Sequence, residues 1–242
     1  MYGWRGRIGL IVPSTNTVCE EELYRMLPDG VSLHTARVFN PVVKTEKEKE
    51  EAMLRMNSEL ERAARELGSV EPKVIVYACT TGSFIKGPGY DREVGERIKR
   101  AAGVPGISTS TAVIEALGKF NLKKIALATP YNPGVGEREK IFLEDTIPGL
   151  KVVKEKHLGY LNALEKGRLT PDYAYRTARE IDGPEVEGFF ISCTDFRTIE
   201  IIESLEADTG KPVVTSNQAS LWMALKEIGV GGVKGYGELF QH

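Results

Sequence analysis

The chain repeats itself, and this repetition limits the folds that are open to it. A segment that begins at Arg7, RIGLIVPSTNTVCEEEL, has a counterpart that begins at Lys124, KIALATPYNPGVGEREK. Two more pairs follow in the same order, KVIVYACTTGS with EGFFISCTDFR and VPGISTSTA with KPVVTSNQA. Their separations shrink slowly, since 124 minus 7 is 117, 193 minus 79 is 114 and 211 minus 104 is 107. Duplication followed by small deletions leaves such a pattern, so we expect two lobes related by approximate two-fold symmetry.

Within each half, short apolar runs alternate with helical patterns. Runs with the length of buried parallel strands cover residues 7–12, 73–78, 104–108, 124–129, 188–192 and 212–215. Between the first two runs, a capping box at Thr45 and Glu48, a helical apolar spacing and a terminating Gly68 predict one helix. Strands that alternate with helices predict an α/β fold, in which each lobe is a parallel β-sheet flanked by helices.

The two lobes need not be contiguous in sequence. The last helix, near residues 218–226, is expected to cross back onto the first lobe. We therefore assign residues 1–119 and 216–242 to the first lobe and residues 120–215 to the second. Because ligands of open α/β sheets bind at the carboxyl ends of the strands, we expect the active site in the cleft between the lobes.

The composition excludes several kinds of partner. Lys+Arg 32 against Asp+Glu 34 gives a formal net charge of −2, which leaves no basic surface for nucleic acid or anionic lipid. No run reaches the roughly 18 to 20 apolar residues of a membrane span, so we expect a cytoplasmic protein without a membrane partner. Three widely spaced cysteines and three histidines indicate neither a disulfide framework nor a metal site.

Two of the cysteines occupy matching places in the repeat. Cys79 and Cys193 each follow an apolar run, and each precedes a threonine. A lone cysteine in this position is usually a small buried hydrophobe, but a matched pair on a two-fold axis would meet across the cleft. There, the N–H groups at the start of a following helix are expected to lower the thiol pKa below about 8.5. Cys19 has no counterpart in the repeat, so we interpret it as structural.

Polar residues near the two cysteines could hold a substrate carboxylate. Backbone N–H groups and hydroxyls follow each cysteine, although turns and caps use the same residue types. Asn16 and Tyr131 follow matching strands and should overhang the cleft, but Asn16 could instead cap the first helix and Tyr131 could be a wedge between loops. His157 could serve as the base of a Cys-His hydrolase, but it lies in a strand-like run.

Several motifs together resemble a known superfamily. ACTTGS, SCTDFRT, PSTNT, TPYNPG and TSNQA are similar to those of the aspartate/glutamate racemase superfamily, and most of all to its maleate cis-trans isomerase and arylmalonate decarboxylase branch. The resemblance implies two pseudo-symmetric α/β lobes with a cofactor-free active site between them. It also implies that Cys79 is the nucleophile and Cys193 the acid/base, and that the substrate carboxylates are held by Asn16, Thr80, Thr81, Tyr131, Asn162 and Thr194.

The resemblance also implies a reaction. Decarboxylases of this branch keep only the second cysteine, so the presence of Cys79 favours isomerisation or racemisation. We expect a homo-oligomeric enzyme that isomerises maleate, or a closely related small dicarboxylate, to the trans form. The alternative is an amino-acid or hydantoin racemase that uses the same cysteine pair. An arylmalonate-type decarboxylase and a non-catalytic small-molecule binder are less favoured.

Overall fold

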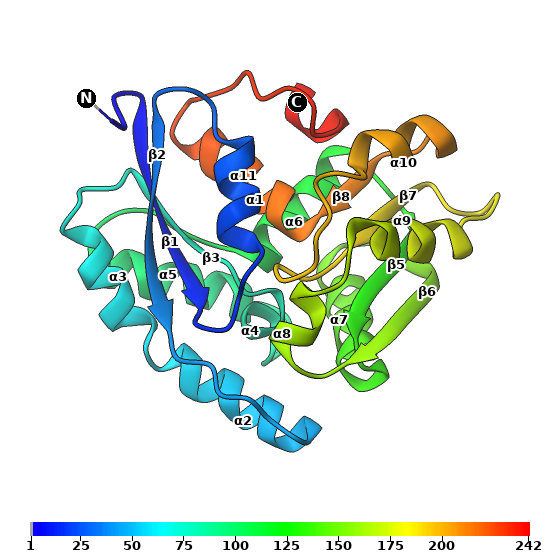
Figure 1. The fold of residues 1–242 in the computed structure, drawn as a ribbon, viewed down its shortest axis with the longest axis horizontal. Helices are drawn as coiled ribbons and strands as arrows, with labels where there is room; N and C mark the ends of the chain where they lie inside the picture. Colours follow the sequence, from blue (N-terminus) through cyan, green and yellow to red (C-terminus); the bar gives the residue numbers. More distant parts are fainter. Residues whose placement is uncertain (1) are drawn as a thin grey trace.

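The computed structural model describes residues 2–242, which fold around two separate parallel sheets. In Figure 1 the first sheet lies on the left and the second on the right. The first sheet contains β1 (Gly6–Pro13), β2 (Val31–Val38), β3 (Val74–Tyr77) and β4 (Gly106–Ser108). The second contains β5 (Lys124–Tyr131), β6 (Lys151–Tyr160), β7 (Gly188–Ile191) and β8 (Val213–Thr215).

The two sheets have the same topology. The strand order is β2-β1-β3-β4 in the first sheet and β6-β5-β7-β8 in the second, and every neighbouring pair is parallel. The repeat in the sequence therefore corresponds to a repeat in the fold, because β1, β3 and β4 take the places of β5, β7 and β8. The predicted α/β architecture of two pseudo-symmetric lobes is confirmed.

Helices connect the strands and cover the sheets. Among residues 2–242, none of them is long and apolar enough to cross a membrane. In the first half they are α1 (Cys19–Met26), α2 (Glu46–Asn57), α3 (Leu60–Gly68), α4 (Thr80–Phe84), α5 (Tyr90–Ala102) and α6 (Thr109–Lys119). In the second half they are α7 (Pro133–Thr146), α8 (Ala163–Gly167), α9 (Pro171–Glu180), α10 (Ile202–Thr209) and α11 (Ser216–Glu227), followed by the short 3₁₀ helix η1 (Glu238–Gln241).

The helix predicted between Thr45 and Gly68 is in fact two helices. Its start is correct, because Thr45 Oγ1 accepts a hydrogen bond from the Glu48 N–H at 3.2 Å. The chain leaves the helical path at Ser58, whose hydroxyl donates to the Arg55 carbonyl at 2.6 Å. A serine hydroxyl that bonds to the preceding turn competes with the backbone ladder, and α3 then starts anew at Leu60. The prediction of one continuous helix is therefore wrong at Ser58.

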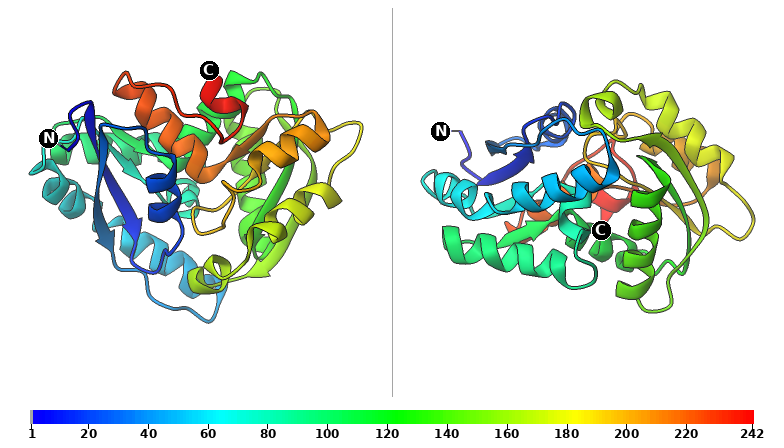
Figure 2. Two further views of the ribbon diagram at one scale, coloured as in Figure 1. Left: turned by 45° about the horizontal axis from the view of Figure 1, so that its top comes forward. Right: turned by 90° about the horizontal axis from the view of Figure 1, so that it is seen from below.

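A continuous apolar core joins the two halves. One cluster of buried side chains runs from Leu10 on β1 through Ala116 on α6 and Leu221 on α11 to Phe190 on β7. A second cluster, which includes Met53 and Ile75, lies on the other face of the first sheet. Helix α11 packs against α6 and α1 and also contacts β8, and it lies between the two sheets in Figures 1 and 2. The boundaries proposed for the lobes stay a prediction.

Candidate active site

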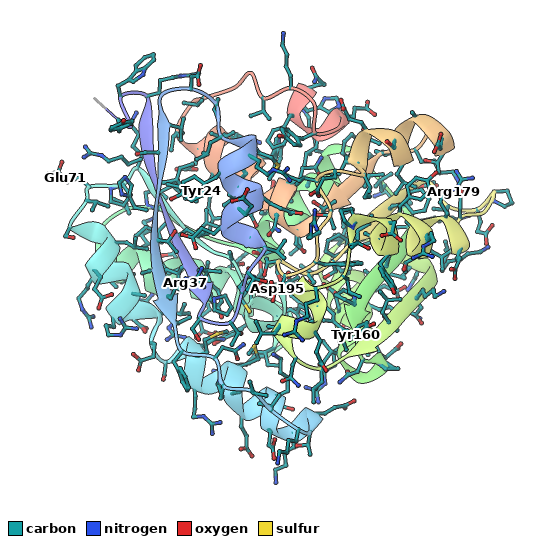
Figure 3. All side chains as sticks on the ribbon, in the orientation of Figure 1. Tyr24, Arg37, Glu71, Tyr160, Arg179 and Asp195 are labelled. Atoms are coloured by element: carbon teal, nitrogen blue, oxygen red, sulfur yellow. The ribbon has the colours of Figure 1, made fainter. Side chains whose placement is uncertain are left out.

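The central strands of both sheets end at one cavity. Its walls include Pro13 at the end of β1, Tyr131 at the end of β5, and the two cysteines that follow β3 and β7. The cavity is small, with a volume of about 30 Å³. Asp195, which also lines it, lies near the middle of the molecule between the sheets (Figure 3). This placement agrees with the expected site at the carboxyl ends of the strands.

Most of the predicted site residues come together in this cavity. Those that line it are Asn16, Cys79, Thr80, Thr81, Tyr131, Cys193 and Thr194. Asn162 lies outside it, in a neighbouring hollow that shares Asn40, Lys49 and Ala163 with the cavity. There the Asn162 side chain accepts a hydrogen bond from the Val43 N–H at 3.0 Å, so it fixes the loop that leads into α2.

Cys79 is the N-cap of the short helix α4. Its Sγ accepts a hydrogen bond from the Gly82 N–H at 3.3 Å, as a cysteine before a helix is expected to do. Nevertheless its pKa is raised, because the cost of burying a thiolate outweighs the Gly82 N–H and the Lys49 charge, which lower it. The expected lowering of the Cys79 pKa is therefore wrong for the empty cavity.

Cys193 is not followed by a helix start. Its backbone has a φ of 105°, its N–H donates to Ser216 Oγ at 3.0 Å, and its Sγ accepts from the Asp195 N–H at 3.3 Å. Burial raises its pKa to about 11; the Lys166 charge opposes this rise and the Asp195 carboxylate adds to it. The Cys193 thiol is therefore protonated at neutral pH, and the expected lowering of its pKa is also wrong.

The threonines that follow the cysteines tie the two halves together. Thr80 Oγ1 donates to Ser216 Oγ at 3.1 Å, and Thr194 Oγ1 donates to the Ala78 carbonyl at 3.2 Å. These two hydroxyls serve the structure, as the alternative interpretation had it. The backbone N–H groups of Thr80, Thr81 and Thr194 have no acceptor among residues 2–242, so they remain available to an anion in the cavity.

Asn16 fulfils both interpretations offered for it. Its Oδ1 accepts from the N–H groups of Val18 and Cys19, at 3.0 and 2.9 Å, and so holds the start of α1. Its Nδ2 lies at the cavity and donates to Thr194 Oγ1 at 3.2 Å. One amide therefore caps a helix of the first half and contacts a cavity residue of the second.

Tyr131 is buried at the cavity wall. Burial raises the pKa of its hydroxyl well above the usual range, and a charge on Cys193 would raise it further. The hydroxyl is therefore a proton donor throughout the neutral range. The Lys166 ammonium lies 4.9 Å from the centre of the Tyr131 ring, a cation–π geometry that places the lysine over this wall.

Three charged residues of the cavity were absent from the sequence-based prediction. They are Lys49 on α2, Lys166 on α8 and Asp195, two residues after Cys193. Burial lowers the pKa of Lys49 to about 8, and the nearby Lys166 charge lowers it further. Burial raises the pKa of Asp195 to about 6, against the Thr17 N–H and the Lys166 charge, which lower it.

A signal for one of these residues is present in the sequence. Lys49 precedes Met53 by four residues, so the helical period places it on the apolar face of α2. A lysine on such a face either extends its ammonium to solvent or serves a buried site. No comparable signal marks Lys166, because α8 is a helix of five residues without a clear apolar face.

The two residues set aside from the site lie elsewhere. Cys19 is buried at the start of α1, and burial raises its pKa well above the usual range, as suits a structural thiol. His157 lies on β6, where its Nδ1 is 3.0 Å from Thr129 Oγ1. Neither residue lines the cavity.

Two repeated α/β halves that place matched thiols in one cavity define the class of this protein, a two-lobed α/β enzyme. Within that class the chain belongs to the arylmalonate decarboxylase family, since residues 8–240 match the model of that family.

Curated relatives of the chain include isomerases and a decarboxylase. The maleate isomerase of Nocardia farcinica is 28% identical over 97% of this chain and 95% of its own. The arylmalonate decarboxylase of Bordetella bronchiseptica is 28% identical over 96% of this chain and 95% of its own. The matches confirm the predicted branch of the superfamily, and the number of maleate isomerases among them supports an isomerase.

Solved structures agree in fold over nearly the whole chain. The maleate isomerase of Pseudomonas putida S16, solved with maleate, has a TM-score of 0.90 at 24% identity and covers 97% of both chains. A cysteine-to-serine variant of the Nocardia farcinica maleate cis-trans isomerase has a TM-score of 0.89 at 26% identity, with 98% of this chain and 99% of that chain covered. That variant carries a covalently bound succinylcysteine intermediate.

Proposed function

We propose that this protein converts maleate to fumarate without a cofactor. The observation that carries the proposal is that two thiols, one from each half of the repeat, line a single small cavity. Further support comes from four maleate isomerases at 26 to 29% identity and from the succinylcysteine intermediate of the Nocardia enzyme.

The chemical difficulty is a C=C bond that does not rotate. The Cys79 thiolate adds to one alkene carbon, and the π electrons move onto the other carbon and its carboxylate as an enediolate. The Cys193 thiol then gives its proton to that carbon, which leaves a succinyl group on Cys79 and a thiolate at Cys193. After rotation about the new single bond, Cys193 takes a proton back, the C–S bond breaks and fumarate leaves.

The neighbours of the thiols suit these steps. Cys79 must ionise, and the Gly82 N–H with the Lys49 ammonium oppose the burial that raises its pKa. The enediolate needs fixed donors, which the free N–H groups of Thr80, Thr81 and Thr194 and the hydroxyl of Tyr131 provide. Cys193 must carry a proton in the resting state, as its pKa of about 11 ensures.

The cavity charges argue against racemisation of an amino acid. Such a substrate brings an ammonium group, which would lie beside two lysine ammonium groups in a buried site. A hydantoin carries no carboxylate for those lysines to bind.

Decarboxylation of an arylmalonate is the second candidate, because the Bordetella decarboxylase is as similar in sequence as the isomerases are. The products of this decarboxylation would differ from those of isomerisation, since carbon dioxide is released.

Proton NMR in deuterated water tests the assignment. Maleate should be replaced by fumarate, which gives its own vinyl signal, with freshly reduced protein and no added cofactor. Unchanged maleate together with exchange of the α-proton of aspartate, glutamate or a hydantoin would establish the racemase instead. Loss of carboxylate from phenylmalonate without conversion of maleate would establish the decarboxylase.

Variants of the two cysteines test the roles within the same assay. Cys79→Ser should abolish both turnover and covalent capture, because no thiolate remains to add. Cys193→Ser should lose turnover yet accumulate a succinyl adduct on Cys79, which mass spectrometry of the intact protein detects. Cys19→Ser is the matched control and should keep turnover. Equal residual activity of the Cys79 and Cys193 variants would contradict the assigned roles.

A further inference from the structure

Two lysines of the cavity have no carboxylate partner among residues 2–242. The exposed fraction of Lys49 is 8% and that of Lys166 is 4%, and both line the cavity. Neither ammonium has a hydrogen-bond acceptor, or a carboxylate within 4.0 Å, among residues 2–242. Lys49 comes from α2 of the first half and Lys166 from α8 of the second.

The Lys49 side chain is largely removed from water without an anionic partner, so its charge in the cavity needs a reason. Buried charges in proteins are normally paired, and removing a cation from water without a partner destabilises the fold. The pKa of Lys49 is depressed to about 8 by this burial and by Lys166. The Lys49 charge therefore costs folding free energy, and an anion bound beside it would reverse that effect.

The other ionisable groups of the cavity do not balance the two lysines. Asp195, with a pKa of about 6, supplies one negative charge at neutral pH, and its Oδ2 is itself unpaired. Cys79, Cys193 and Tyr131 all have raised pKa values and are neutral there. The side chains that line the cavity thus carry more positive than negative charge.

We propose that Lys49 and Lys166 together bind the two carboxylates of the substrate and make the site selective for doubly ionised four-carbon dicarboxylates. The proposal rests on the proposed function for the identity of the reaction but not for the binding itself. Lysine suits this role because its ammonium is a compact charge that needs no planar partner. The Tyr131 ring beneath Lys166 fixes the position of one of the two charges.

Binding of unreactive acids tests the proposal without turnover. Isothermal titration calorimetry compares succinate, a four-carbon dianion, with butyrate, a four-carbon monoanion. Lys49→Met and Lys166→Met should each weaken succinate binding about 10- to 100-fold, as the loss of a charge-assisted hydrogen bond does, and should weaken butyrate binding much less. Lys47→Met, at an exposed position of the same helix, is the control and should change neither.

Thermal unfolding of the empty protein separates binding from a structural role. Because burial of the Lys49 charge costs folding free energy, the Tm of Lys49→Met should rise while its succinate affinity falls. A lower Tm together with equal losses for succinate and butyrate would overturn the proposal. Failure to convert maleate would overturn the proposed function alone, since succinate binding does not depend on it.

The pH dependence of succinate binding tests the role of Lys49 without a lysine variant. Above pH 8 Lys49 loses its charge in the empty protein, so succinate affinity should fall between pH 7 and 9.5. The Cys79→Ser background removes a cavity thiol whose ionisation would also change the charge of the site, and butyrate serves as the reference ligand. Succinate affinity that does not change over this range would overturn the role of Lys49.

Discussion

At the scale of single residues, the two cysteines differ in backbone conformation. Cys79 has the extended conformation of an N-cap, with a φ of −151°. Cys193, at the matching place of the second half, has a φ of 105°, which side chains other than glycine adopt rarely and at a cost. The positive φ turns the second thiol away from the helix-capping arrangement of the first. One repeated position has thereby become two chemically distinct groups.

Gly82 leaves the space that the Cys79 thiol occupies. A Cβ at this position would lie 3.0 Å from Cys79 Sγ and closer still to the hydroxyl of Tyr77, which is buried and donates to Asn57 Oδ1 at 2.6 Å. Gly82→Ala should lower kcat about 10²-fold, because a displacement of the nucleophile by about 1 Å has that effect. Steady-state kinetics with maleate measure it.

A control with the same chemical change isolates this effect. Gly118 lies in α6, and a Cβ there meets no atom within 4 Å. Gly118→Ala should leave kcat unchanged and stabilise the helix by roughly 0.5 to 1 kcal/mol. Full activity of Gly82→Ala would show that the thiol does not need its observed position.

The two cysteines of the cavity were predictable from the sequence, whereas the charged residues around them were not. Cys79 and Cys193 stand out because the repeat aligns them, and Asn16 and Tyr131 follow from the same alignment. Lys166 reaches the cavity only because α8 packs where the two halves meet, and the sequence near Lys166 does not encode that contact. The pKa directions failed for a related reason, since burial of the thiols depends on residues from both halves.

At the scale of secondary structure, helix α7 is joined to the end of β7 by a buried carboxyl group. Ser192 Oγ donates to Glu139 Oε1 at 2.6 Å, while Glu139 Oε2 has no partner within residues 2–242. Burial raises the pKa of Glu139 to about 8, against the Ser192 hydrogen bond. Glu139 is thus largely protonated at neutral pH. It contacts Ser192, the residue immediately before Cys193.

This contact makes stability depend on pH. The Glu139 carboxyl is neutral in the folded protein up to about pH 8 but ionises above about pH 4.5 when unfolded, so its cost to folding grows between these values. Glu139→Gln removes the cost. Urea unfolding should find the variant and the parent similar at pH 5, and the variant more stable by a few kcal/mol at pH 9.

A second glutamate of α7 provides the comparison. Glu137 is exposed on the same helix, so Glu137→Gln should leave the pH dependence of unfolding as it is. If Glu139→Gln and the parent lose stability in parallel from pH 5 to 9, the carboxyl is not neutral in the fold.

The two edge strands with polar residues, β2 and β6, were missed, whereas the central strands and the short edge strands β4 and β8 were predicted. The runs that predicted β1, β3, β5 and β7 are almost fully buried and therefore almost wholly apolar. The edge strands β2 and β6 were not predicted as strands of the sheets. Most positions of VSLHTARV and KVVKEKHLGY are only half-buried, so polar residues interrupt the apolar run.

At the scale of the whole molecule, one carboxylate joins α1 of the first half to the second half. Glu22 Oε1 accepts from the N–H groups of Thr198 and Ile199 at 2.6 and 3.2 Å, and Oε2 accepts from Asn217 Nδ2 at 2.7 Å. The side chain is 3% exposed, and burial raises its pKa to about 7. This junction holds the loop that follows Cys193 against α1.

Removing the Glu22 junction should weaken the entire fold. Glu22→Ala leaves the Thr198 and Ile199 N–H groups buried without an acceptor, at a cost of about 2 to 4 kcal/mol. Chemical denaturation should show a transition at lower urea concentration. Glu21→Ala, at an exposed position of the same helix, should change stability by less than about 0.5 kcal/mol. A Glu22→Ala variant as stable as Glu21→Ala would show that the halves do not depend on this carboxylate.

The packing of α6 against α11 bears on the origin of the chain. These helices follow β4 and β8, so they hold equivalent places in the two halves, and they pack against each other between the sheets. Contact between equivalent surfaces is the rule in a symmetric dimer, where one patch meets its own copy. The present molecule has the arrangement that joining the two subunits of such a dimer end to end would produce. A gene for the single ancestral unit would then have encoded only half of each active site, and catalysis would have required two copies from the outset.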